Sequence, residues 1–410
     1  MFDFMLRNSR KGLILTIAVG LSACSGAIVK ELSVQPVTLS PVKPIEAEEL
    51  VSHDLISFDV YADGPVLHAL FAAATDTPMR PYVGYIRSDD GGLHWSAPMP
   101  LGQHAMATLE SSAGNEIQIA VAGDSVLAVW QVTGEIPGMG PLQAVYSLDG
   151  GQHWQSGANP GGAETDQSHP DLVADRLGRF HLVWLDDRDE NGFQGIRYAR
   201  TSNAGQTWDL AQTIDESTCS CCWNRLVIGP NEQVNVLYRD MEPRDMALAQ
   251  SNDAGQSWRR LSTVGEFNWH FDGCPHNGGA LAWADNTLQA LVWTGVEGKA
   301  GLYHLSSSDN GKSWSLPQAM GGGSLAFHSD IAAIGQHVLA LWDARGAEGS
   351  AVLISESFDN GKHWSPARQI STPGSSAQFP RLVATSSAWL AMWVEQKPGA
   401  SKQWMTAILQ

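Results

Sequence analysis

From residue 51 onward the chain repeats one arrangement of hydrophobic and polar positions. A short apolar segment is followed by a second that often ends in Trp, a polar loop, a third apolar segment, a polar turn and an exit segment. In the third copy the apolar segments are 171–174, 181–184 and 196–199, and the exit segment runs to Ile214. Apolar segments this short, bounded by turn residues, are typical of strands. Four short strands in a period of about fifty residues predict one blade of a β-propeller.

The polar turn has the same sequence in six copies. It fits Ser/Thr-x-Asp/Asn-x-Gly-x-x-Trp and ends at Trp95, Trp154, Trp208, Trp258, Trp314 and Trp364. We expect the Asp or Asn side chain to accept hydrogen bonds from backbone N–H groups two residues on, and the Gly to adopt positive φ. The Trp is expected to pack between neighbouring sheets. The pattern resembles the Asp box, or BNR repeat, of bacterial sialidase-like proteins, where it fastens turns and seldom takes part in chemistry.

The number of blades follows from what comes after the sixth turn. Segments 379–383, 389–393 and 403–409 form a seventh unit with three strands and no repeated turn. Because an unpaired strand edge is unfavourable, we expect residues 31–39 to supply its fourth strand. The sequence therefore favours an all-β propeller of seven four-stranded antiparallel blades. The alternative is six, with units one and seven sharing a blade or one of them outside the ring. The sialidases themselves have six blades, so seven would depart from the resemblance.

The N-terminus has the features of an export signal. Arg7, Arg10 and Lys11 precede a short apolar run at 13–21, which is too short to span a bilayer. The run ends in Leu-Ser-Ala-Cys, which resembles a bacterial lipobox and implies lipidation of Cys24. We therefore predict a signal peptide at 1–23, a tether at 24–50 and a propeller at 51–410. The resemblance implies a lipid anchor in the outer membrane or on the periplasmic side. An ordinary signal peptide with a chance Cys is the alternative.

The charge balance limits the partners. The chain has 25 basic and 43 acidic residues, a formal charge of −18. A nucleic-acid surface needs a basic face, so we expect no nucleic-acid partner. An anionic sugar would be repelled as well, unless arginines gather locally.

Antiparallel strands sort the loops onto two faces of the propeller. The first and third hairpins of each blade share one face, which carries the repeated turns and is called the turn face below. The second hairpins and the links between blades share the other face, called the link face. The chemically suggestive residues fall on the link face, where loops over a rigid scaffold commonly carry function.

Four cysteines lie in two adjacent links. Cys219, Cys221 and Cys222 precede unit four, and Cys274 precedes unit five together with His276. An even cysteine count in an exported protein favours disulfides, including a vicinal Cys221–Cys222 bridge among three pairings. The alternatives are a site for copper or zinc, since thiolates and imidazoles suit Cu(I) and Zn(II), and free or redox-active thiols. His169 and His328 occupy comparable positions before the strands of units three and six.

The sialidase resemblance implies a second kind of site. Sialidases hold a substrate carboxylate with three arginines and use a Tyr–Glu pair as nucleophile and an Asp as acid/base. On the link face these roles would fall to Tyr238, Glu242 and Asp187, and the candidate ligand-binding arginines are Arg188, Arg225, Arg239, Arg345 and Arg381. The Arg-Ile-Pro that opens sialidase domains is absent. For Arg188 and Arg345 we favour a local role, pairing with the Asp residues beside them.

Two functions therefore remain open. The preferred one is a sialidase-like propeller lipoprotein that binds a glycan or protein ligand or assists assembly, with the Cys/His cluster on its link face. The alternative is an exported exo-sialidase-type glycoside hydrolase acting on acidic sugars. Fold alone does not decide between them.

Overall fold

The computed structural model describes residues 36–45, 54–76, 79–101, 108–113, 116–135, 137–162, 166–186, 194–347 and 349–410. The predicted signal peptide, Cys24, Asp187 and Arg188 lie outside these residues. Residues 36–410 form one compact unit. Among the described residues, no helix combines the length and hydrophobicity needed to cross a bilayer.

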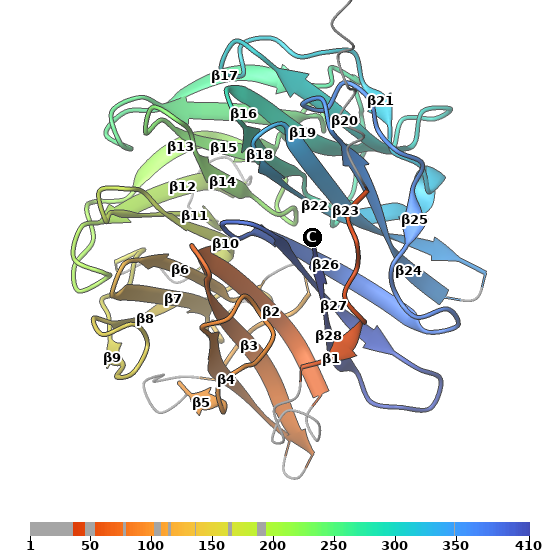
Figure 1. The fold of residues 1–410 in the computed structure, drawn as a ribbon. Coiled ribbons are helices and arrows are strands. Elements are labelled where there is room, and N and C mark those ends of the chain that lie inside the picture. Colours follow the sequence, from red (N-terminus) through yellow and green to blue (C-terminus); the bar gives the residue numbers. More distant parts are fainter. Residues whose placement is uncertain are drawn as a thin grey trace, which may run out of the picture. The chain divides into compact units, whose positions relative to one another are not determined.

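The compact unit is a seven-bladed β-propeller of four-stranded antiparallel sheets, as predicted (Figure 1). Blades one to three comprise β2–β5 (Asp54–Asp63, Val66–Asp76, Met79–Ser88, Met99–Pro100), β6–β9 (Gln118–Ala122, Ser125–Gln131, Leu142–Ser147, Gln155–Ser156) and β10–β13 (Gln167–Ala174, Phe180–Asp186, Gln194–Thr201, Gln212–Thr218). Blades four to six comprise β14–β17 (Arg225–Ile228, Val234–Arg239, Met246–Ser251, Arg259–Val264), β18–β21 (Ala280–Ala284, Thr287–Thr294, Gly301–Ser307, Gln318–Ala319) and β22–β25 (Ala326–Ile334, His337–Gly346, Gly349–Ser357, Arg368–Gln369). One short 3₁₀ turn, Gly323–Leu325, precedes β22.

The seventh blade joins the two ends of the described chain. Its strands β26 (Ser376–Ala384), β27 (Trp389–Gln396) and β28 (Gln403–Leu409) are completed by β1 (Lys43–Pro44), which pairs with β28. Upstream of β1, Leu39 bridges Leu409, and the Thr38 N–H donates to the Gln410 carbonyl at 2.7 Å. The closing strand was therefore expected in the right blade but too early in the chain. Of the segment predicted to pair, only its last two residues do so, and 31–35 lie outside the described residues.

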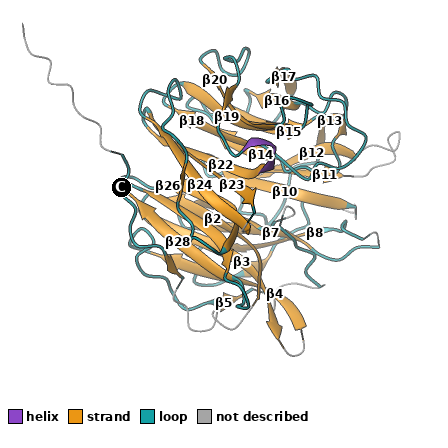
Figure 2. Cartoon of the chain, turned by 90° about the vertical axis from the view of Figure 1, so that its right-hand side faces the viewer, coloured by secondary structure: helices purple, strands orange, loops and turns teal. Residues whose placement is uncertain are grey.

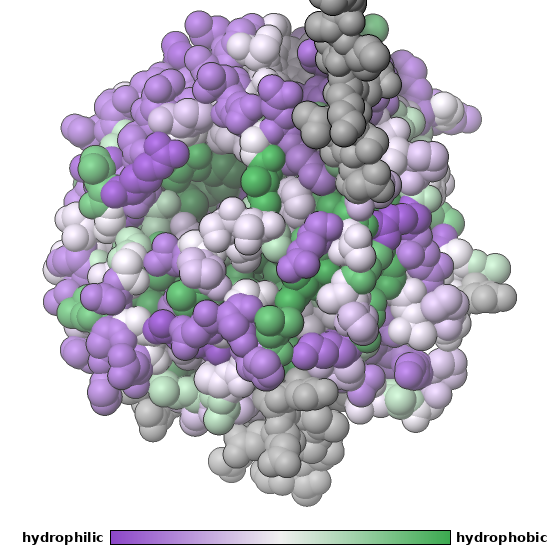
Figure 3. Space-filling view, in the orientation of Figure 1, coloured by the Kyte–Doolittle hydropathy of each residue, from purple (hydrophilic) through white to green (hydrophobic). Residues whose placement is uncertain are grey.

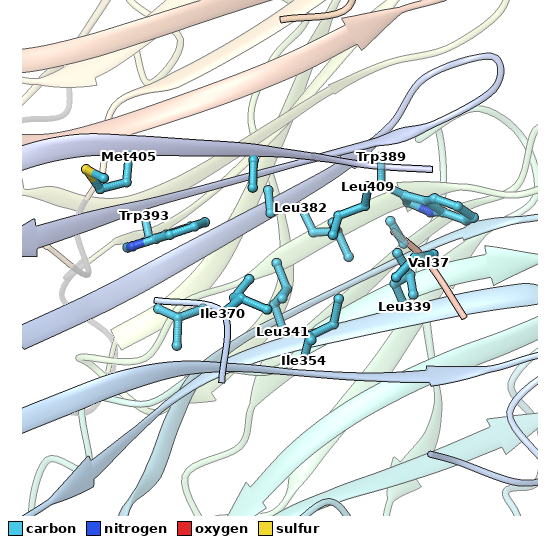
Figure 4. Close-up of a cluster of buried hydrophobic side chains, with 14 of the residues drawn as sticks. Val37, Leu339, Leu341, Ile354, Ile370, Leu382, Trp389, Trp393, Met405 and Leu409 are labelled. Atoms are coloured by element: carbon cyan, nitrogen blue, oxygen red, sulfur yellow. The ribbon is translucent and has the colours of Figure 1, made fainter. Parts of the chain in front are cut away.

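Apolar side chains fill the spaces between blades. The second strands of four blades each contain a Trp with no exposed surface, namely Trp130, Trp184, Trp342 and Trp393. Between blades six and seven, Trp393 and Leu341 belong to one apolar cluster with Val37, which lies at the end of the cluster near Leu339 and Trp389 (Figure 4). The N-terminal segment therefore contributes to this interface. Burial of apolar surface on both sides of every sheet is the main stabilising force of this ring.

The repeated turns are held together by a fixed set of hydrogen bonds. In blade four the Ser251 hydroxyl donates to Asp253 Oδ1 at 2.7 Å and accepts from the Gly255 N–H at 2.7 Å. Asp253 Oδ1 also accepts from the Ser257 N–H at 2.8 Å, four residues on rather than the two that we expected. The N–H two residues beyond Asp253, that of Gly255, donates to the Ser251 hydroxyl instead. Gly255 has φ of 83°, and the Trp258 ring contacts Tyr198 of blade three at 4.8 Å, both as predicted.

The strand registers confirm the assignment of loops to two faces. In blade three, Gln167 at the start of β10 pairs with Asp186 at the end of β11, and Gln194 at the start of β12 pairs with Thr218 at the end of β13. The blade links and second hairpins therefore share one end of the sheet, opposite the repeated turns. The C-terminus, which follows a third strand, marks the turn face and lies at the left in Figure 2.

The outer surface is mostly polar. In the view of Figure 3, hydrophilic residues dominate the rim, and hydrophobic residues gather in a hollow nearer the middle of the face. This distribution matches the sequence pattern, in which loops are polar and strands apolar.

The packing of the turns yields a stability prediction. A Cβ added to Gly255 would overlap the Tyr198 hydroxyl, and φ is positive there, whereas Gly123 also has positive φ of 60° but no neighbour within 4 Å of its added Cβ. We expect Gly255→Ala to lower the free energy of unfolding by about 1–3 kcal/mol more than Gly123→Ala, because only the former adds overpacking to backbone strain. Equilibrium denaturation with guanidinium measures both. Equal losses in the two variants would contradict the proposed packing of the turn against Tyr198.

Candidate metal and ligand site on the link face

A cavity of about 470 Å³ opens on the link face. One wall is formed by the two cysteine-bearing links, through Cys221, Trp223, Cys274 and His276. The facing residues come from the innermost strands of blades three, six and seven and from loops near β6 and β7, and they include His169, His328, Phe379, Met139 and Ser111. The cavity thus gathers thiols, imidazoles and aromatic rings from segments far apart in sequence.

Four residues that line this cavity have an unfavourable backbone conformation. His169, His276, His328 and Phe379 have φ of 51°, 48°, 43° and 56°. Three of them lie at bulges in β10, β22 and β26, where the register with the second strand shifts. The left-handed conformation is unfavourable for residues with a Cβ and persists only where the surroundings enforce it. Its recurrence at the same bulge in three blades makes these residues candidates for a functional surface.

The thiols and His276 approach to metal-binding distances. Cys219 Sγ lies 2.8 Å from Cys222 Sγ and 3.7 Å from Cys221 Sγ. The donor atoms of Cys219, Cys221 and Cys222 lie within 4.8 Å of one another, and so do those of Cys221, Cys274 and His276. All four cysteines carry free thiols in the structure. Sulfur and imidazole donors at this spacing suit a soft or borderline metal ion.

Backbone contacts fix the first cysteine link. The Cys219 N–H donates to the Arg239 carbonyl at 2.9 Å, and the Thr218 hydroxyl donates to the Gln194 carbonyl at 3.0 Å. After the cysteines, the Asn224 side-chain amide donates to the His169 carbonyl at 3.1 Å. The link is therefore attached to blades three and four on both sides of the thiols.

Two arginines fix the second link. The Arg239 guanidinium donates to the carbonyls of Asn277 and Trp293 at 3.0 Å each and lies 5.3 Å from the centre of the Trp269 ring. Arg244 donates to the Phe271 carbonyl at 3.1 Å. Arg239 is nearly inaccessible to solvent, so the structure uses this candidate substrate arginine to hold the loop that carries Cys274 and His276.

The surroundings shift the pKa values of the three clustered thiols in different directions. The pKa of Cys219 is lowered because the thiols of Cys221 and Cys222 donate to it, with a smaller contribution from the positive charge of Arg239. Burial raises the pKa of Cys222. Burial also lowers the pKa of His169 to about 4, so its imidazole is neutral at physiological pH. The pKa of Cys221 is raised, because its thiol donates to the sulfurs of Cys219 and Cys222.

His328 is held by a carboxylate. Its Nδ1 lies 2.6 Å from Asp343 Oδ2, which also accepts the Phe379 N–H at 2.9 Å. The imidazole packs on the Phe379 ring at 4.2 Å and on the Trp223 ring at 4.9 Å. This arrangement fixes the ring, and Nε2 lies on the side opposite the carboxylate. Asp343, which we expected to pair with Arg345, has these partners instead, and Arg345 is exposed.

Two candidate arginines lie in the central channel beside acidic groups. Arg381 Nη2 contacts Glu116 Oε2 at 2.7 Å, and Arg225 lies 3.7 Å from Asp171 and 3.4 Å from Asp330. Asp171 and Asp330 also accept backbone N–H groups from the next blade, at Leu226 and Leu382. Ion pairs therefore engage both guanidinium groups that we considered for a substrate carboxylate.

The candidate nucleophile and its partner are engaged separately. Tyr238 is fully buried in the interface between blades three and four, and its hydroxyl donates to Asp215 at 2.7 Å. Burial raises the pKa of this phenol, and the charge of Asp215 adds to the effect. Glu242 is exposed and contacts His270. The sialidase pairing of Tyr with Glu is not assembled by these two residues.

The sequence contains a signal that groups Phe379 with the histidines of the cavity. Phe379-Pro380 stands in the seventh unit where His169-Pro170 stands in the third, so Phe379 belongs with the histidines. The roles of Trp223 and Asp343 had no comparable signal, because both depend on contacts between blades.

Comparison with known proteins agrees with this fold. The model of a family described as a BNR repeat-like domain matches residues 63–268, just over half of the chain. No curated protein sequence matches the chain.

Several solved structures are similar to it over most of its length. The polysaccharide lyase Uly1 is 10% identical with a TM-score of 0.59, covering 88% of this chain and 90% of its own. A PL25 ulvan lyase is 10% identical with a TM-score of 0.60, covering 87% and 94%. The NanB sialidase of Streptococcus pneumoniae is 11% identical with a TM-score of 0.49, covering 87% and 68%. At these identities the likeness shows the fold alone.

The central channel generates a prediction about pH. Burial raises the pKa of Asp171 to about 7, from an ordinary value of 3.8, against the opposing charge of Arg225. The folded state therefore holds this proton where the unfolded chain has released it, and stability falls as pH rises from about 4 to about 7. We expect Asp171→Asn to reduce that fall by on the order of a few kcal/mol, because the amide does not titrate.

Urea denaturation at pH 4, 5.5 and 7 measures the change, with the exposed Asp124→Asn as control. A fall in Asp171→Asn as steep as in the parent protein would show that Asp171 does not carry the raised pKa.

Proposed function

Because the chain belongs to the family of BNR repeat-like domains, we propose that it is an exported, lipid-anchored propeller that serves as a ligand-binding or assembly module and holds a soft metal ion on its link face. The observation that carries the proposal is the donor set of Cys221, Cys274 and His276 at the cavity wall. It shares Cys221 with a second, buried set that contains Cys219 and Cys222. Export and anchoring through Cys24 rest on the signal-like N-terminus.

The chemistry of the donors favours Cu(I). Thiolates and imidazole are soft or borderline ligands, and Cu(I) ranks among the ions that they select. Structural Zn(II) takes four ligands in tetrahedral geometry, which this cluster would also supply if a fourth donor joined the three around Cys221. The carbonyl-bound Arg239 adds a positive charge behind the thiols, and this charge lowers the cost of gathering thiolates.

The cavity supplies the ligand-binding part of the proposal. Its wall combines the metal donors with the Trp223 and Phe379 rings and with the Asp343-bound His328. Apolar walls with a few fixed polar groups are typical of binding sites. A glycan or a protein segment entering here would meet both the ion and the aromatic rings.

Metal content tests the proposal. We expect the purified protein to bind about one equivalent of Cu(I) in anaerobic competition with a chromogenic chelator, and Cys274→Ser and His276→Ala to weaken binding by at least about a hundred-fold. His363→Ala, which alters an exposed imidazole on a repeated turn, is the matched control and should bind as the parent does. Binding of Zn(II) without binding of Cu(I) would show that the ion is zinc rather than copper. Binding of neither ion would overturn the proposal.

The exo-sialidase-type hydrolase is the alternative, favoured by Arg225 and Arg381 in the mouth of the propeller. A fluorogenic sialoside assay separates the two functions, and we expect no turnover because both guanidinium groups are paired with carboxylates. Turnover that is lost in Arg381→Ala, in a variant that retains its fold by circular dichroism, would favour the hydrolase.

A further inference from the structure

We propose that the cysteines divide into two pairs of different chemistry: Cys219 and Cys222 form a disulfide, while Cys221 and Cys274, with His276, hold the metal ion. The metal half of this inference rests on the proposed function, and the disulfide half does not. The division follows from where the sulfur atoms lie.

The distances separate Cys219 and Cys222 from the others. Their Sγ atoms lie 2.8 Å apart, whereas Cys219 Sγ lies 3.7 Å from Cys221 Sγ. Thiolates that share a tetrahedral ion, each about 2.3 Å from it, lie about 3.8 Å apart. The Cys219–Cys222 approach is too close for two ligands of one ion, and the chain turns at Ser220 and Cys221, which brings the first and fourth residues of the C-x-x-C segment together.

Access to the cavity divides the cysteines in the same way. Cys221, Cys274 and His276 line the cavity, and Cys219 and Cys222 lie behind its wall with 0% and 1% of their surface exposed. Among the described cysteines, an ion that exchanges with the cavity therefore meets only the thiols of Cys221 and Cys274. Cys219, Cys221 and Cys222 form one buried cluster, in which Cys221 has the largest exposed fraction, 7%.

The disulfide requires an electron acceptor, which we take to be the disulfide of an exported dithiol–disulfide oxidoreductase acting before the link is packed. The Cys219 thiolate attacks one sulfur of that disulfide and releases its partner sulfur as a thiolate, forming a mixed disulfide. The Cys222 thiolate then attacks Cys219 Sγ, so that the Cys219–Cys222 bond forms and the second sulfur of the acceptor leaves. Two electrons and the two cysteine protons pass to the acceptor, which becomes a dithiol.

The division leaves an incomplete coordination sphere facing the cavity. Two thiolates and one imidazole supply three donors, and three-ligand sites characteristically keep a position for an exogenous group. The Cys219–Cys222 bond closes the link behind Cys221 and holds its thiolate toward the cavity. The ligand class that fits the remaining position is a soft donor, such as a thiolate, thioether or imidazole of a partner chain.

Peptide mapping tests the disulfide. Protein exported in cells and purified without reductant is unfolded with a Cu(I) chelator, alkylated and digested with trypsin, which releases all three cysteines of the first link in the peptide 201–225. We expect this peptide to carry one alkyl group, at Cys221. Its mass should be lower by two hydrogens than that of the same singly alkylated peptide with two free thiols. Reduction before alkylation should give three alkyl groups.

Copper binding tests the division of roles. We expect the double variant Cys219→Ala/Cys222→Ala to retain Cu(I) affinity within about ten-fold of the parent, and Cys221→Ala to lose at least about a hundred-fold while keeping the Cys219–Cys222 disulfide. The retained disulfide shows that the Cys221→Ala link still folds.

Three results would overturn the inference. They are a disulfide that contains Cys221 or Cys274, three alkylated thiols without reductant, or a double variant that binds Cu(I) as weakly as Cys221→Ala. Parent protein that binds no copper yet contains the disulfide would defeat the proposed metal function, and with it the metal half of the inference, while supporting the pairing.

Discussion

Closure of the ring by the N-terminal segment is the constraint on which the rest of the structure depends. Strand β28 would otherwise expose a row of unpaired N–H and C=O groups, and the hydrogen bonds of Thr38 and Leu39 with the last residues of the chain satisfy them. The same segment brings Val37 into the core between blades six and seven. Strand β1 completes the outer edge of blade seven, whose innermost strand, β26, contacts the innermost strands of blades six and one.

The closed ring explains why the carboxylates of the inner strands are buried. Asp59, Asp171 and Asp330 each accept a backbone N–H from the next blade, at Ile119, Leu226 and Leu382. These bonds join neighbouring blades where their strands converge most closely. Burial raises the pKa of Asp59 to about 6 and that of Asp171 to about 7, so the charged form of the acid is disfavoured at these two joints. Arg225 and Arg381 offset part of that cost, and this accounts for their place in the channel.

The repeated strands and turns could be predicted from the sequence. Features that depend on a single contact between blades could not. Six copies of one turn, and three strands after them, were sufficient for seven blades and for the assignment of loops to faces. The closing strand was placed too early because an apolar stretch near Leu39 looks like a strand, whereas backbone pairing at Lys43–Pro44 leaves little trace in side-chain pattern. Arg239 and Tyr238 looked available for a substrate because sequence does not report burial. In the structure, Arg239 donates to a carbonyl group of a loop, and the Tyr238 hydroxyl donates to Asp215.

Strain and anchoring act together at the cysteine links. His276 has a left-handed backbone in a loop that Arg239 and Arg244 hold by its carbonyl groups, and Cys219 is held by the Arg239 carbonyl. One residue therefore positions both links, with its side chain on the second and its backbone on the first. Donors that are positioned in advance lose less conformational entropy when an ion binds. The same buried guanidinium also stabilises a thiolate electrostatically, so a residue that resembles a substrate arginine in sequence is used here to build the wall of the cavity.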